Sequence, residues 1–139
     1  MNDNADAIVF FGFAVGWIGM LAGAITGAIC GLFFHRDDWM GGYGSYRRRL
    51  ARLGHIACFG VGFLNILFAL THHALHVEKT CANVALWGFA IGMVSMPACC
   101  FLAAWKQSFR HLFPIPVIAI GIGILGCLSG LFNHARAVL

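Results

Sequence analysis

The feature that most constrains this sequence is a set of long apolar runs. Three of them contain no Asp, Glu, Lys or Arg, namely residues 7–34, 80–104 and 112–133. A fourth run, 53–71, is uncharged apart from the ionisable ring of His55. A helix needs about 20 apolar residues to cross the ~30 Å hydrocarbon core of a bilayer, so each run is long enough to span one. The sequence therefore predicts four transmembrane helices, over about 7–34, 51–76, 80–104 and 112–134.

The composition agrees with a membrane protein. Only 10% of the residues are charged and 60% are hydrophobic, whereas soluble domains carry about 25% charged residues. A chain of 139 residues is expected to form one domain. We therefore expect an all-α integral membrane protein in a lipid bilayer, whose single membrane domain, residues 1–139, is a four-helix up-down bundle with short connections.

The basic residues predict how the helices are oriented. One side of the membrane receives Lys79 and Arg136, and the other receives Arg36, Arg47, Arg48, Arg49, Arg52, Lys106 and Arg110. Cytoplasmic loops are enriched in Lys and Arg, so the loops 35–50 and 105–111 are predicted to be cytoplasmic and both termini to lie on the outer, extracytoplasmic side. The first apolar run is too long for a signal peptide and is expected to be kept as a span. The expected location is the inner (cytoplasmic) membrane of a bacterium.

The first connection contains the basic stretch SYRRRLARL. We interpret it as an anchor at the inner membrane surface, and we expect no nucleic-acid partner. Trp39, Tyr43 and Tyr46 in the same region suit a membrane interface. The chain has no Walker loop, no Ser-His-Asp pattern and no HExxH motif. Neither a hydrolase nor a nucleotide-binding enzyme is therefore predicted, and no residue is given a catalytic role.

Glycines recur at every third or fourth position of the predicted spans: Gly12, Gly16, Gly19, Gly23, Gly27 and Gly31 in the first, Gly88 and Gly92 in the third, and Gly126 and Gly130 in the fourth. Small residues with this spacing let helix backbones approach closely in a membrane. We interpret them as packing faces within the bundle or against other membrane subunits. The alternative is that they leave room for a flat cofactor between helices.

Polar groups form a stripe along the second predicted helix. At 100° per residue these polar groups and two small residues fall within about 100° of arc. The polar residues are His55, Asn65, His72, His73 and His76, and the small ones are Gly62 and Ala69. Ionisable groups inside membranes generally face protein or a cavity, so this face is predicted to point away from lipid. His55 and His73 are separated by about 27 Å along a helix, which places imidazoles near both membrane faces.

Three further histidines lie at the ends of other spans. His35 and His111 are predicted at the inner face with His55, and His134 at the outer face with the His72, His73 and His76 group. We expect His111 to pair with His55 and His134 with His76, because the second and fourth helices of a closed bundle can face each other across its centre. His35 is the rival ligand at the inner face.

Imidazole at both faces predicts a redox cofactor. The first hypothesis is b-type haem, for transmembrane or quinone-linked electron transfer, with each iron held by two imidazoles from different helices. The seven histidines at the two faces are the candidate ligands, and we expect His55 and one of His72, His73 and His76 to be among those used. The arrangement resembles that of four-helix membrane cytochromes in helix count and in having histidine at both faces. An electron carrier or a subunit of an electron-transfer complex is then expected, with haem b as the cofactor.

The second hypothesis is copper, in a transporter or an assembly factor for a membrane metalloenzyme. Thiolate, thioether and imidazole suit Cu(I), and the predicted ligands are His72, His76, Cys58, Met96, Cys99 and Cys100, with Met93 nearby. A third hypothesis is a non-catalytic subunit whose glycine-rich faces dock into a larger membrane complex.

Overall fold

The computed structural model describes residues 3–138, and within them the chain forms four long helices. These are α1 (Asp3–Leu32), α2 (Tyr46–Leu75), α3 (Lys79–Trp105) and α4 (Pro114–Val138). Two short 3-10 helices, η1 (Trp39–Gly41) and η2 (Gln107–Leu112), lie in the first and last connections. All four long helices are long and apolar enough to cross a membrane. The predicted all-helical class is confirmed, and so is the prediction of four helices that are long and apolar enough to span a membrane.

Side chains at the connections decide where the helices begin. The Ser45 hydroxyl accepts a hydrogen bond from the amide of Arg48 at 3.1 Å, so α2 begins at Tyr46, five residues before the predicted start. The carboxylate of Glu78 caps α3 by accepting bonds from the amides of Thr80 and Cys81, at 2.8 and 3.1 Å. Pro114 is the first residue of α4, where its missing N–H costs nothing.

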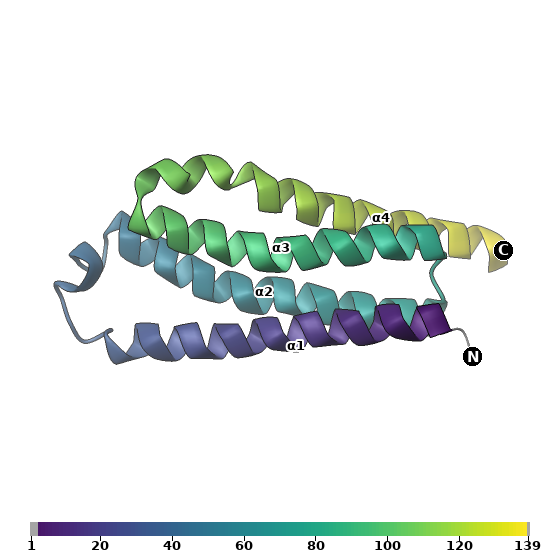
Figure 1. Ribbon diagram of the computed structural model, residues 1–139, viewed down its shortest axis with the longest axis horizontal. Helices are drawn as coiled ribbons and strands as arrows, with labels where there is room; N and C mark the ends of the chain where they lie inside the picture. Colours follow the sequence, from purple (N-terminus) through teal and green to yellow (C-terminus); the bar gives the residue numbers. More distant parts are fainter. Residues whose placement is uncertain (1–2, 139) are drawn as a thin grey trace.

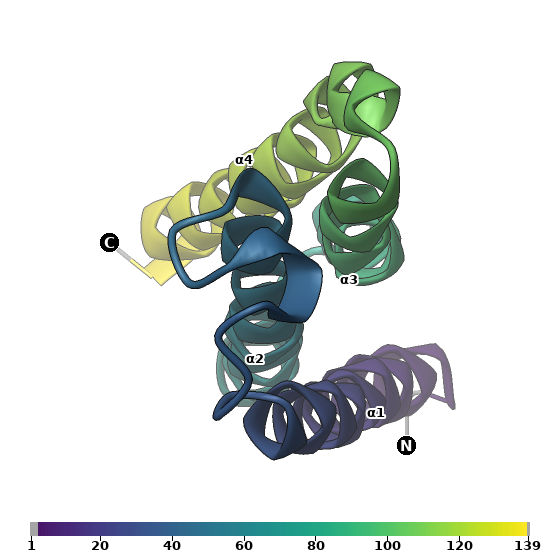
Figure 2. The same ribbon diagram turned by 90° about the vertical axis from the view of Figure 1, so that its left-hand side faces the viewer.

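The helices alternate in direction, and the start of α1 and the end of α4 lie at the same end of the molecule (Figure 1). Each helix packs on the next one in the chain, and α1 also touches α3. Over the described residues α1 and α4 make no contact, and α2 and α4 touch only slightly. Figure 2 shows α1 and α4 on opposite sides of the α2–α3 pair. The bundle is therefore open, and the expected facing of the second and fourth helices across a closed centre is not found.

The glycines pack successive helices together. A methyl group on Gly88 would lie 2.6 Å from Cα of Gly123, so α3 and α4 meet there backbone to backbone. A methyl group on Gly62 of α2 would lie 3.0 Å from the carbonyl oxygen of Gly16 in α1. Gly31 has no neighbour within 4 Å. Apart from Gly31, the glycines of the predicted faces are used for packing inside the chain, and docking of partner subunits through them stays a prediction.

Candidate functional site

His72, near the end of α2, is buried without a hydrogen-bond partner. Its side chain is 5% exposed, and neither Nδ1 nor Nε2 bonds to any group in the described part of the chain. The ring stacks on Phe68, with centroids 6.2 Å apart and planes at 14°. Buried polar atoms are nearly always paired, and leaving one unpaired costs about 1–3 kcal/mol. His72 therefore has two ring nitrogens whose hydrogen-bonding capacity is not used by the described part of the chain.

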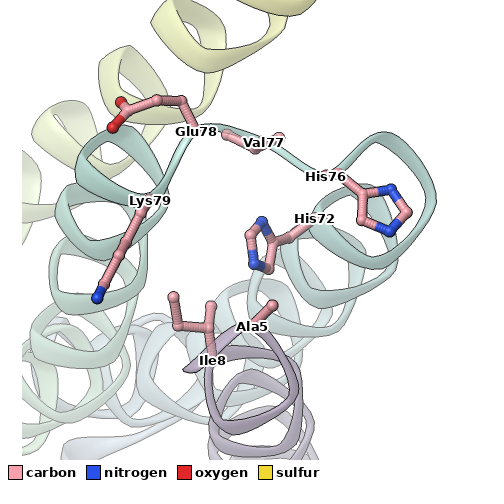
Figure 3. A pocket seen from close by; sticks show the side chains of 7 residues that line it. All are labelled: Ala5, Ile8, His72, His76, Val77, Glu78 and Lys79. Carbon is pink, nitrogen blue, oxygen red and sulfur yellow. The ribbon is translucent and has the colours of Figure 1, made fainter. Parts of the chain in front are cut away.

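A cavity of about 250 Å³ lies in front of this ring. Its apolar wall is formed by Ala5, Ile8 and Val77, and its polar lining by His72, His76, Glu78 and Lys79. In Figure 3 the His72 ring points into the space between the first turns of α1 and α3, and Lys79 stands on the facing wall. We call this space the His72 cavity. It combines an apolar surface with the imidazole of His72.

The two other ionisable groups of the cavity are turned aside. The ring of His76 lies on the outer side of the end of α2, and the carboxylate of Glu78 points away from His72 (Figure 3). His76 has a left-handed backbone (φ 47°, ψ 50°), and its N–H donates to the carbonyl of His72 to end the helix. The amides of Thr80 and Cys81 hold the pKa of Glu78 down to about 2. The charged carboxylate of Glu78 therefore accepts hydrogen bonds from the first amides of α3 rather than from a group in the cavity.

A second cavity, of about 260 Å³, continues from the first. The two share Ile8 and Lys79, and the second runs between α1 and α3 along Ala7, Phe11, Asn83, Leu86 and Trp87. The rings of Phe11 and Trp87 lie 5.8 Å apart across it. Trp87 is eight residues beyond Lys79, or about 12 Å along the helix. This α1–α3 groove leads from the His72 cavity toward the middle of the bundle.

Gly62, Asn65 and Ala69 of the predicted stripe on α2 also face protein. Asn65 is 0% exposed, and its amide nitrogen donates to the carbonyls of Val61 at 2.9 Å and Phe89 at 3.3 Å. The bond to Phe89 ties α2 to α3, while the amide oxygen finds no partner within residues 3–138. Unlike these buried members, His73 is exposed. The stripe thus buries Asn65 and His72 but leaves His73 at the surface.

His55 is half-buried against α1. Its Nδ1 donates to the carbonyl of Gly23 at 2.8 Å, because a carbonyl can only accept. The ring lies over Gly27, where a methyl group would collide with it, and meets Phe59 edge to face at 5.4 Å. The proton is then on Nδ1, and Nε2 carries a lone pair. Metal-binding histidines use this tautomer when their Nδ1–H donates to a carbonyl.

The remaining predicted histidine ligands lie apart from these two. His35 is exposed in the first connection, His111 is exposed in η2, and His134 is half-buried on α4. Since His55 faces α1 while η2 packs on α3 and α4, the structure does not bring His55 and His111 together. Within residues 3–138 no group of three or more His, Cys, Asp or Glu side chains has a metal-binding arrangement.

The predicted sulfur ligands lie in the apolar interior. Cys58 and Met93 belong to one buried cluster, with Met96 packed against it. Cys99 and Cys100 are buried on α3 as free thiols. These positions are typical of packing residues, and copper binding by them stays a prediction.

The opposite end of the bundle contains a buried cation that hydropathy did not reveal. Arg48 is 1% exposed, and its guanidinium donates to the carbonyls of Phe34 at 2.8 Å and Arg36 at 3.3 Å. The rings of Phe34, Trp39 and Tyr43 surround it at 5.1, 5.5 and 5.2 Å. The aromatic residues of this connection therefore enclose Arg48 and tie the end of α1 to the start of α2.

No protein family, curated protein or solved structure matches this chain.

Proposed function

We propose that this chain is an integral membrane protein that binds a small amphipathic ligand at His72. The observation that carries the proposal is a buried imidazole that lines a cavity and whose two nitrogens have no hydrogen-bond partner in the described part of the chain. Buried donors and acceptors in a binding site contribute strongly to specificity. A ligand that forms hydrogen bonds with them binds well, whereas a ligand that cannot form these bonds leaves them buried and unpaired. His72 is the residue that recognises the polar part of the ligand.

The shape of the site supports an amphipathic ligand. The His72 cavity is lined by the imidazole of His72, and the α1–α3 groove is lined mainly by apolar side chains such as Phe11 and Leu86. Each space, at about 250 and 260 Å³, is below the ~300–1,000 Å³ of a typical ligand pocket. A ligand with its polar head in the His72 cavity and its apolar tail in the α1–α3 groove would occupy both spaces.

The test compares small molecules that copurify with matched variants. The protein is purified in a mild detergent, denatured with organic solvent, and the released compounds are identified by mass spectrometry. His72→Leu should lose a compound that the wild type and His73→Leu retain. Replacing an unpaired buried imidazole by an apolar side chain should not unfold the helix end, and equal melting temperatures would verify this. Identical extracts from both variants would refute the proposal.

His55 favours a second candidate function, the redox protein predicted from the sequence. Its free Nε2 is the atom that would bind haem iron or another metal, and the carbonyl of Gly23 holds the ring in the required tautomer. A bound haem would supply one-electron chemistry. A Soret band that shifts on dithionite reduction and is lost in His55→Ala would support haem. Stoichiometric copper in a colourless protein would support the copper alternative, and absence of both would remove this candidate.

A further inference from the structure

We propose that the polar head recognised by His72 is a quinone ring, with its apolar tail in the α1–α3 groove. This inference rests on the proposed ligand-binding function and names the class of ligand. It concerns binding of the quinone and its reduced quinol form, both of which are membrane-soluble.

The hydrogen-bonding capacity of His72 favours this head group. A neutral imidazole has one N–H donor and one acceptor nitrogen. A quinone carbonyl accepts from the N–H, and a quinol hydroxyl donates to the bare nitrogen, so one ring can serve both forms by changing its tautomer. A phosphate or carboxylate offers acceptors only and would favour a charged imidazolium, which is costly at a site where the side chain is 5% exposed.

The walls of the His72 cavity suit a flat ring. Ala5, Ile8 and Val77 present apolar surface to it. Lys79 lines both the cavity and the groove. It stands on the wall opposite His72, with its ammonium directed along α3 and away from the His72 ring (Figure 3). A ring carbonyl in the cavity would therefore accept its hydrogen bond from His72.

The groove gives the tail a path. It begins at Ile8 and Lys79 and extends as far as Phe11 and Trp87, between two helices that are apolar enough to lie in a membrane. The head therefore lies at the end of the bundle, and the tail runs toward its middle, as expected of a molecule that partitions into the bilayer from its head-group region.

The test is a titration with a benzoquinone that carries a ten-carbon tail, using the full chain in phosphatidylcholine nanodiscs. Quinones quench tryptophan fluorescence, and Trp87 lines the groove. The wild type and His73→Leu should show saturable quenching that Trp87→Phe largely removes. His72→Leu should bind about tenfold more weakly, the effect of one lost hydrogen bond. His72→Gln, which keeps a donor, should recover part of the affinity.

The outcomes separate this inference from the proposed function. Equal quinone affinity in the wild type and His72→Leu, or no saturable quenching, would overturn the quinone assignment. If a phospholipid or fatty acid then copurifies with the wild type and is lost from His72→Leu, the ligand-binding function stands and only the ligand class is wrong. If nothing copurifies in a His72-dependent way, both proposals fail.

Discussion

Replacing Gly88 with alanine should weaken the contact between α3 and α4. The added methyl group would lie 2.6 Å from Cα and N of Gly123 and 2.7 Å from the carbonyl oxygen of Ala119, whereas ordinary contact begins near 3.4 Å. All three neighbours are backbone atoms that cannot rotate away, so the helices must separate by about 0.8 Å. Overpacking of this kind costs about 1–3 kcal/mol. Alanine recovers up to ~1 kcal/mol through its helix propensity, and we expect a net loss of about 1–2 kcal/mol.

The measurement is the free energy of unfolding in mixed micelles of SDS and a mild detergent, followed by circular dichroism. The matched control is Gly121→Ala, two residues before Gly123, where a methyl group would have no neighbour within 4 Å. The control should leave the free energy unchanged or raise it by up to ~1 kcal/mol. If the two variants unfold at the same SDS fraction, backbone contact at Gly88 does not hold α4 on α3.

Three further predictions concern other polar groups. Arg48→Lys should loosen the first connection, because one ammonium cannot reproduce the two hydrogen bonds and the ring contacts of the planar guanidinium. Trypsin should then cleave after Arg36 faster in Arg48→Lys than in the control Arg49→Lys, which changes an exposed arginine. Asn65→Leu should keep the free energy of unfolding within about 1 kcal/mol of the wild type, because it removes the unpaired side-chain oxygen together with the hydrogen bonds of the side-chain NH2 group. A loss above ~2 kcal/mol would contradict this. Glu78 has its pKa lowered from 4.5 to about 2, so its contribution to stability is present above pH 4.5 and is lost as the pH falls toward 2. The protection of the Thr80 amide, taken relative to its intrinsic exchange rate at each pH, should therefore fall over that range. In Glu78→Gln this pH-dependent loss of protection should be absent.

The number of helices could be predicted because the length and hydropathy of a span are local properties of the sequence. The helix starts depend on single side chains, Ser45 and Glu78, whose capping bonds do not appear in a hydropathy pattern. Closure of the bundle could not be predicted, since glycines at regular spacing show that helices approach closely but not which pairs do so.

The candidate site was predicted only in part. Helical periodicity placed His55, Asn65 and His72 on one protein-facing side. It could not show that the carbonyl of Gly23 would satisfy His55 while His72 would be left without a partner, because this depends on how α1 lies across α2. Arg48 was interpreted as a surface anchor by its charge, and its burial results from the aromatic connection that folds over it.

The open arrangement has a consequence for how the protein is made. Nearly all helix contacts join neighbours in the chain, since α1 packs on α2, α2 on α3 and α3 on α4, and α1 and α4 do not meet in the described structure. Contacts between segments close in sequence form quickly, because little chain entropy is lost in closing short loops. Each helix can therefore find its partner as soon as both have left the ribosome. Only the sparse contacts of α1 with α3 and of α2 with α4 have to wait for a later helix.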